Sequence, residues 1–537
     1  MRKSYIVFQP KMTASKIIAK LNSMFVGLER RPWLAGSWLA VIFLTLFSFL
    51  QRHPTILDSD AFYHAKMAQF LSQGIIIKDF PWLPFTILAD YYTDHHFLYH
   101  VVLAPFVWVF DPLIAMKVAI VVLGVAALLV YFWALRRLGA VGAFWWTILA
   151  ATSWPFLFRL NLVKALPLSL IIFLLGLVAL KEKRRWLLAL LSFIYVWTYN
   201  AWPILFATVL VYSLITFYLN WRKNLRDGLL PLLFAFLSNV VGLVLNPYFP
   251  NNLWFSWKHI VGIGLIPTST NLVGQEWLRY SLPQLYLGAA PLFIFLLVLA
   301  FVLVIVVIEK RRLPFIDQPE RIFCFTIIIT AVALFFATII SRRYVEYFIP
   351  VAYLGLALSF TVLARSSIIL SSGDLLNKWT HSRPLAAIIL SVVFFALIGA
   401  NAYQVTNDVD KKLRGGYPLI HLRKVSLWLQ YNLPANEVVF NLLWDDFTAL
   451  FYFNDKQRYG VGLDSRFLKR DGYDTMLVWE KLFRGLEKNP AKIFKETFRT
   501  KYVLISYFHP NKAIDMFRAY NWPVIYEDAE STVYAIP

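Results

Sequence analysis

The sequence predicts a mostly α-helical, polytopic membrane protein that ends in a small α/β domain outside the membrane. Of its 537 residues, 59% are hydrophobic and 15% are charged, whereas soluble domains are about half apolar and about a quarter charged. Apolar residues form runs of about 15 to 25, the length that crosses roughly 30 Å of hydrocarbon. Charge returns to ordinary soluble levels only after about residue 403. These observations argue against a water-soluble enzyme.

Basic clusters set the predicted topology. Residues 1–33 carry seven Lys and Arg among the first 31 positions against Glu29 alone, so we expect a cytoplasmic amphipathic segment before an uncleaved first span. The clusters at 181–185, 222–226 and 310–312 mark the cytoplasmic side, because Lys and Arg are enriched in cytoplasmic loops. This topology places loops 52–100 and 247–283 outside.

The transmembrane region is predicted to cover residues 34–402 with about eleven helices. Three apolar runs, 97–110, 113–134 and 143–158, fall where only an even number of crossings fits the topology. The run 97–110 is short and contains Pro105, so we expect it to be the partial or juxtamembrane helix.

Residues 403–537 are predicted to form the extracytoplasmic α/β domain. Short β-branched and aromatic runs at 437–440, 502–505 and 523–526 predict strands, and patterns at 421–432 and 476–498 predict helices. We expect the whole chain in a prokaryotic cytoplasmic (inner) membrane, since no eukaryotic retention signal is obvious.

The charge distribution argues against a nucleic-acid partner, and the cysteine count excludes sites that need several cysteines. The net charge of +21 would suit nucleic acid, but much of the excess flanks apolar runs and is explained by topology. Cys324 is the only cysteine, which excludes an intrachain disulfide and a Cys-based zinc site.

The first external loop gathers acids and histidines. Asp58 and Asp60 follow the first span, where carboxylates either bind a hard metal ion or accept a proton from a nucleophile; simple helix capping is the alternative. Asp60 and His64 share a helical face. Asp94, His95 and His96 follow in the same loop, each histidine being either a metal ligand or a solvated residue.

Basic residues stand on the same side as these acids. Arg159, Lys164 and Arg343 lie at predicted external junctions, where charge is costly unless it meets an anion or water. They either bind phosphate or snorkel to the interface. Glu276 in loop 247–283 is either a third carboxylate of the site or an ordinary loop acid.

Several motifs together resemble the GT-C class of membrane glycosyltransferases, most closely the catalytic subunits of oligosaccharyltransferases. Asp60, His64 and Lys66 stand as in that family's Asp-Pro-Tyr-Tyr-His-Tyr-Arg pattern. Further similarities are Tyr199-Asn200-Ala201-Trp202, the Glu276-bearing loop, Arg343–Phe348, and Leu443-Trp444-Asp445-Asp446-Phe447 in place of Trp-Trp-Asp-Tyr-Gly. The family's second acidic motif is missing, and the segment from Arg159 to Lys164 stands in its place.

The resemblance implies a GT-C fold and transfer of a sugar or oligosaccharide from a polyprenyl-phosphate or pyrophosphate donor in the lipid bilayer to a protein, glycan or lipid acceptor. Asp60 would be the general base or a metal ligand, supported by Asp58. The donor phosphate would meet basic residues: Arg159, Lys164, Arg343 and, more weakly, Lys66. Acceptor-side or supporting candidates are His64, Asp94, His95, His96, Glu276, Trp444 and Asp445.

A Mn or Mg ion held by Asp60, Asp94 and Glu276 is compatible with the resemblance, because some GT-C enzymes use a metal and others none. Two alternatives stay open at this point. A lipid-linked glycan flippase or transporter would bind the same substrate without transfer, although transporters usually show repeated halves. An O-antigen ligase or polymerase would use the same donors with a different fold.

Overall fold

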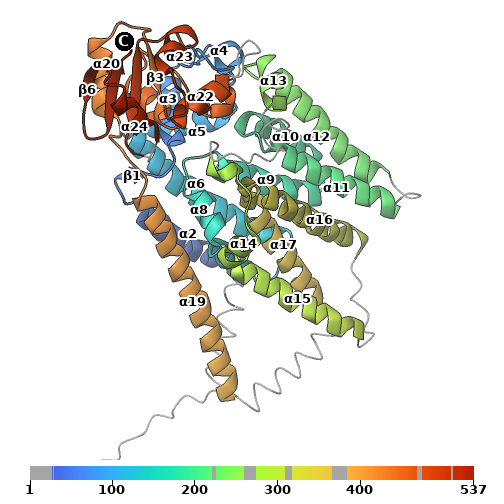
Figure 1. Ribbon diagram of the computed structural model, residues 1–537. Coiled ribbons are helices and arrows are strands. Elements are labelled where there is room, and N and C mark those ends of the chain that lie inside the picture. The colour runs from blue at the N-terminus through green and yellow to red at the C-terminus, as the bar shows by residue number, and fades with distance from the viewer. Residues whose placement is uncertain are drawn as a thin grey trace, which may run out of the picture.

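The computed structural model describes residue 27 and residues 30–220, 225–258, 274–308, 317–365, 384–468, 475–508 and 512–537. Figure 1 shows a region of apolar helices with an α/β domain at one end, formed by the C-terminal part of the chain. Most of the predicted segment 1–33, the basic residues 222–223 and 310–312, and the middle of loop 247–283 lie outside the described residues.

Seven described helices are long and apolar enough to cross a membrane. They are α2 Pro32–Leu50, α6 Pro112–Arg137, α11 Trp202–Asn220, α12 Arg226–Val244, α16 Gln318–Ile340, α17 Val345–Ala364 and α19 Pro384–Arg414. The helices α14 Leu282–Gly288 and α15 Ala290–Ile308 form an eighth candidate, bent by 91°. Three apolar helices are shorter: α5 Phe97–Val107, α9 Leu166–Lys181 and α10 Arg185–Thr198. The fold is therefore that of a polytopic membrane protein, and the total of about eleven spans stays a prediction.

Two of the apolar runs around α6 are too short for a straight span. Helix α5 has 11 residues, which is about 17 Å at 1.5 Å per residue, as expected for the run 97–110. The run 143–158, predicted to cross, is instead α7 Ala143–Ala151 followed by α8 Trp154–Leu160. A continuous helix would drive the ring of Pro155 into the carbonyl of residue 151, so the chain breaks at Thr152 and Ser153.

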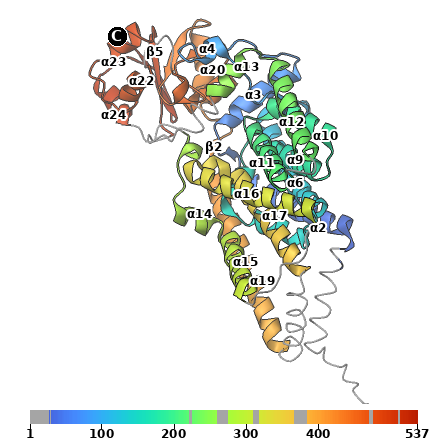
Figure 2. The same ribbon diagram turned by 90° about the vertical axis from the view of Figure 1, so that its right-hand side faces the viewer.

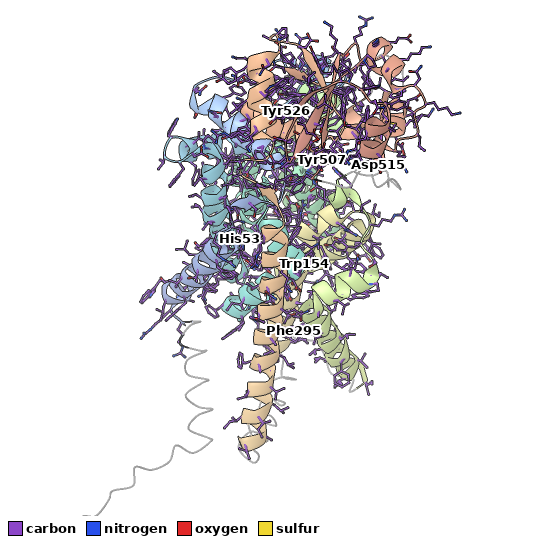
Figure 3. All side chains as sticks on the ribbon, turned by 60° about the vertical axis from the view of Figure 1, so that its left-hand side comes forward. His53, Trp154, Phe295, Tyr507, Asp515 and Tyr526 are labelled. Atoms are coloured by element: carbon purple, nitrogen blue, oxygen red, sulfur yellow. The ribbon has the colours of Figure 1, made fainter. Side chains whose placement is uncertain are left out.

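The helices differ in how far they are enclosed. Over an 18-residue stretch of the span that contains α17, 78% of residues are buried, against 6% over a stretch of the same length in α19. Helix α17 therefore forms the middle of the helical region, while α19 lies along its outside and extends away from the α/β domain (Figures 1 and 2). The apolar side chains that α19 exposes, such as Leu390 and Val392, have the composition of a lipid-facing surface. Figure 3 labels Trp154 and Phe295 in this helical region.

The C-terminal domain has a five-stranded sheet in the order β4-β3-β5-β7-β6. Its strands are β3 Val438–Asn441, β4 Arg458–Tyr459, β5 Tyr502–Ser506, β6 Val524–Glu527 and β7 Ser531–Ala535. Strand β3 is parallel to β4 and β5, whereas β7 is antiparallel to β5 and β6. Its helices are α20 Arg423–Asn432, α21 Asp446–Phe453, α22 Thr475–Phe483, α23 Pro490–Glu496 and α24 Lys512–Ala519. Tyr507, Asp515 and Tyr526 mark this domain in Figure 3.

The predicted elements of this domain are largely confirmed. The three predicted strands are β3, β5 and β6, and the first predicted helix is α20. The predicted helix 476–498 is divided into α22 and α23, because Gly485 takes a positive φ of 65° and Pro490 starts a new helix. Strands β4 and β7 were not predicted.

The segment that follows α2, predicted to be the first external loop and called the external segment below, joins the two regions. After α2, strand β1 Thr55–Ile56 pairs antiparallel with β2 Tyr417–Pro418, and helix α3 Asp60–Ser72 packs on α21. Arg52 and His53 both bind the Asp410 carboxylate of α19, at 2.6 and 2.8 Å. Figure 3 labels His53 near the start of the segment. The acids that follow α2 are therefore fixed between the apolar helices and the C-terminal domain.

Candidate active site

A cavity of about 90 Å³ lies where these parts of the chain meet. The external segment contributes Asp60, His64, His95 and His96, and the C-terminal domain contributes Asp464 and Phe467. The remaining wall comes from loops and short helices, with Lys164, Tyr199, Glu276, Trp277 and Arg343. Residues predicted from four separate parts of the sequence are thus brought to one place.

Asp58 and Asp60 take different positions at the start of α3. Asp58 Oδ1 accepts the backbone N–H of Asp60 at 3.1 Å, which is a local capping contact. Asp60 lies in the first helical turn and lines the cavity. Its side chain is 30% accessible, against 14% for Asp58. Of the two acids, Asp60 is the one that a substrate in the cavity would meet.

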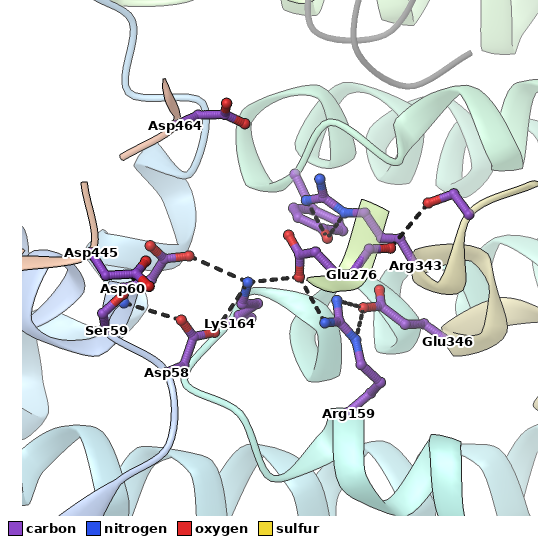
Figure 4. Close-up of polar contacts among 12 residues, drawn as sticks. Asp58, Ser59, Asp60, Arg159, Lys164, Glu276, Arg343, Glu346, Asp445 and Asp464 are labelled. Atoms are coloured by element: carbon purple, nitrogen blue, oxygen red, sulfur yellow. Dashed lines mark hydrogen bonds and ion pairs between the residues drawn. The ribbon is translucent and has the colours of Figure 1, made fainter. Parts of the chain in front are cut away.

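Lys164 joins three carboxylates. Its Nζ lies 3.1 Å from Asp58 Oδ2, 3.3 Å from Asp60 Oδ2 and 2.8 Å from Glu276 Oε2 (Figure 4). The ammonium group has three N–H donors, so each carboxylate can receive one. The loop between α8 and α9 presents this lysine to acids from the first external segment and from the 3-10 helix η2 Gln275–Trp277.

Arg159 forms the next layer of this network. Its Nη1 donates to Glu276 Oε2 at 2.7 Å, and its guanidinium also binds Glu346 Oε1 (Figure 4). Ser341 Oγ donates to the Glu276 carbonyl at 3.1 Å and fixes the backbone of η2. Burial alone would raise the pKa of Glu276, but the charges of Lys164 and Arg159 hold it well below its usual value. Glu276 is therefore an ionised part of the site rather than an ordinary loop acid.

Two acids of the site have raised pKa values. Burial, followed by the charge of Asp58, raises the pKa of Asp60 to about 7, although Lys164 acts in the opposite direction. Burial and the charges of Asp60 and Asp446 raise the pKa of Asp445 to about 8. Asp445 reaches the site through Ser59, whose Oγ lies 3.4 Å from Asp445 Oδ1. A carboxyl group that titrates near neutral pH is suited to general base catalysis.

Arg343 is a cation of the cavity wall whose guanidinium hydrogen-bonds a neutral hydroxyl group. Its Nε and Nη2 donate to the Tyr199 hydroxyl at 2.8 and 2.6 Å, and its guanidinium lies 4.8 Å from the Trp277 ring centroid. Arg466 lies on the same indole, also at 4.8 Å. Arg342 points elsewhere and binds the Arg279 carbonyl. Glu276 and Glu346 act on Arg343 through their charges, but its guanidinium hydrogen-bonds a neutral hydroxyl. This side chain can therefore receive an anion without displacing a carboxylate.

Asp94 belongs to a buried chain of hydrogen bonds that ends at the cavity. Its Oδ2 lies 2.7 Å from His100 Nδ1, and His100 Nε2 lies 2.7 Å from His64 Nδ1. The Asp94 carboxylate accepts from Nδ1–H of His100. When Nε2 of His100 accepts in turn from Nδ1–H of His64, Nε2 of His64 is unprotonated. Burial and the nearby His100 lower the pKa of His64 well below its usual value. The chain therefore fixes the tautomer of a cavity-lining histidine.

The predicted metal triad is not assembled. Asp60 and Glu276 both bind Lys164, whereas Asp94 binds His100. Across the described ranges, no group of three or more His, Cys, Asp and Glu side chains is arranged to hold a metal ion. The residues of this site do not fit a divalent ion, because an ammonium group already occupies the point where its carboxylates converge.

Three other predicted residues lie beside the cavity rather than in its wall. Lys66 forms an ion pair with Asp455 at 2.9 Å, Trp444 packs against the core of the C-terminal domain, and Asp445 contacts Ser59 and Tyr417. His95 and His96 do line the cavity, with their rings 3.8 Å apart. Asp464 and Phe467 were missed, since nothing in the local sequence sets this tail loop apart.

Comparison with solved structures shows that the chain has the GT-C fold. The oligosaccharyltransferase of Archaeoglobus fulgidus matches with a TM-score of 0.60 and 14% identity, over 88% of this chain and 69% of that one. ArnT from Cupriavidus metallidurans, bound to undecaprenyl phosphate, matches with a TM-score of 0.51 and 13% identity, over 94% and 98%. The mycobacterial arabinofuranosyltransferase AftD matches with a TM-score of 0.53 and 13% identity, over 94% and 40%. No protein-family model matches the sequence, and a search of curated proteins finds no match. The fold predicted from the sequence motifs is that of integral membrane glycosyltransferases.

Proposed function

We propose that this protein is a membrane glycosyltransferase that transfers a sugar or oligosaccharide from a polyprenyl-phosphate or pyrophosphate donor to an extracytoplasmic acceptor. The observation that carries the proposal is the cavity between the apolar helices and the C-terminal domain, with an acid and a cation in its wall. A lipid tail can lie among apolar helices while its phosphate meets a basic residue at the interface. The undecaprenyl phosphate in the similar ArnT structure is a ligand of this kind.

Asp60 is assigned as the general base toward the acceptor. It is the more accessible of the two acids at the start of α3, and it faces the cavity. Its pKa of about 7 gives a substantial ionised fraction at neutral pH while keeping the carboxylate basic enough to accept a proton. Asp58 supports it by holding the helix start and Lys164.

Arg343 is assigned to the donor phosphate. Negative charge grows on the leaving phosphate during glycosyl transfer, and a preorganised cation there stabilises the transition state. Arg159 and Lys164, expected from the sequence to share this role, are each bound by carboxylates. We therefore assign them to positioning Glu276 and Asp60, and Lys66 to the contact with the C-terminal domain.

The acceptor is assigned to the side of the cavity formed by the histidines and the C-terminal domain. His64, His95 and His96 line it. Asp445 contacts Ser59, and Trp444 lies near Gly274, the residue before η2. The bound acceptor peptide in a similar oligosaccharyltransferase structure illustrates one acceptor class; a glycan or a lipid is the alternative. This assignment requires the C-terminal domain to be extracytoplasmic, in a prokaryotic inner membrane.

The test is sugar transfer by the full-length protein in lipid nanodiscs, with a panel of polyprenyl-phosphate and pyrophosphate sugars. We expect sugar-dependent release of the lipid phosphate that falls at least 100-fold in Asp60→Asn. Asp79→Asn removes an exposed acid of the same external segment and should leave turnover unchanged. Full activity in Asp60→Asn would refute the assignment of the base. Donor binding without turnover on any donor would favour a flippase or transporter.

A further inference from the structure

We propose that Lys164 is a built-in cation that takes the place of a divalent metal ion, so that sugar transfer by this protein needs no metal. The inference about cation binding stands on the geometry of the site alone. The inference about turnover rests on the proposed function.

Lys164 occupies the point at which the acids converge. Its Nζ lies 2.8 to 3.3 Å from three carboxylate oxygens, those of Asp58, Asp60 and Glu276. A hard divalent ion requires several such oxygens at roughly 2.0 to 2.6 Å. An ion at that distance from the same oxygens would be crowded against the ammonium group and repelled by it.

The lysine is held in this position by the fold. It lies in the short loop between α8 and α9, where its backbone N–H donates to the Leu162 carbonyl at 2.8 Å. Asn161 fastens the loop to the end of α2, because the Gln51 amide donates to the Asn161 backbone and side-chain oxygens at 3.0 and 3.2 Å. Only 12% of the Lys164 side chain is accessible. A solvated surface lysine would show neither the anchoring nor the burial.

Arg159 supplies a second cationic group to the Glu276 carboxylate. The same oxygen, Glu276 Oε2, receives Lys164 Nζ at 2.8 Å and Arg159 Nη1 at 2.7 Å. A metal ion on this oxygen would place a third cationic group beside the two already present. Like charges in a poorly solvated site repel strongly. The arrangement therefore favours a single ammonium charge over a divalent ion.

The first arm of the test is Mn²⁺ binding, followed by electron paramagnetic resonance, to the full chain in nanodiscs. We expect no Asp60-dependent Mn²⁺ site in the wild type or in Lys164→Arg, which keeps the charge. Lys164→Ala should bind Mn²⁺ at least tenfold more tightly than the wild type, and Lys164→Ala/Asp60→Asn should lose this gain. A wild-type Mn²⁺ site that Asp60→Asn removes would overturn the proposal, as would a folded Lys164→Ala that gains no site. If Lys164→Ala does not fold, the wild-type titration still decides.

The second arm is turnover in the presence of EDTA. We expect the wild-type rate to stay within twofold of its value with Mn²⁺, and a loss of more than tenfold would overturn the proposal. If no donor is turned over, the proposed function fails, whereas Mn²⁺ binding still tests the role of Lys164. The two failures are therefore distinguishable.

Discussion

The pH dependence of turnover tests the role of Asp60 most directly. With a pKa of about 7, the carboxyl is about 9% ionised at pH 6, about half ionised at pH 7 and about 91% ionised at pH 8. If the ionised form is the base, kcat/KM should rise about tenfold between pH 6 and pH 8. An aspartate at its ordinary pKa near 4 would be almost fully ionised throughout, and the profile would be flat.

Two variants should move this profile in opposite directions. The charge of Asp58 raises the pKa of Asp60, so Asp58→Asn should shift the rise to lower pH. Lys164 lowers the pKa of Asp60, so Lys164→Ala should shift the rise to higher pH. Damage to folding would not shift the pH of this rise in opposite directions. The two variants therefore control for such damage in each other.

The assay is the initial rate of lipid-phosphate release at limiting donor concentration, in mixed buffers of constant ionic strength. Asp445 has a pKa of about 8 and titrates in the same range, so Asp445→Asn is measured in parallel and should retain the rise. A wild-type rate that changes less than twofold between pH 6 and pH 8 would refute the reasoning. So would a shift of the same sign in Asp58→Asn and Lys164→Ala.

Three further predictions follow from single contacts. Arg343→Ala should lower donor kcat/KM about 100-fold, while its neighbour Arg342, bound outside the cavity wall, should tolerate Ala within about threefold; equal effects would contradict the phosphate assignment. Asp94→Asn should lower kcat about tenfold with little change in donor KM, because it frees the tautomer of the histidine chain; a change in KM alone would argue against this. Gly416→Ala should destabilise the protein by about 1–3 kcal/mol in thermal unfolding, since its Cβ would lie 2.6 Å from the main chain of β1, whereas Gly399→Ala meets nothing within 4 Å; equal melting temperatures would contradict the close fit.

The elements that the sequence predicts well are those set by local pattern. Long apolar runs gave the spanning helices, and short β-branched runs gave β3, β5 and β6, because both patterns depend on neighbouring residues alone. The run 143–158, expected to cross, is divided into α7 and α8 at Thr152 and Ser153, because Pro155 interrupts the helical hydrogen bonding. Strand β4, of two residues, is too short to leave a pattern.

The sequence predicted which residues form the candidate site, but not which cation pairs with which acid. Charge outside the membrane pointed to Asp60, Lys164, Glu276 and Arg343, and all four line the cavity. Which cation meets which acid depends on how α8, η2 and α3 pack, and no spacing in the sequence encodes this. Asp94 was therefore grouped with the wrong carboxylates.

The pairing of cations with acids determines which cation can receive a substrate anion. Lys164 and Arg159 are both matched by carboxylates, whereas Arg343 is matched by the neutral Tyr199 hydroxyl. An incoming phosphate would have to displace internal acids from the first two cations but none from Arg343. The network therefore directs the anionic part of a donor to one side of the cavity. Asp60 stands in the wall of the same cavity with a carboxyl group that titrates near neutral pH, which separates the group that accepts a proton from the group that receives the leaving phosphate.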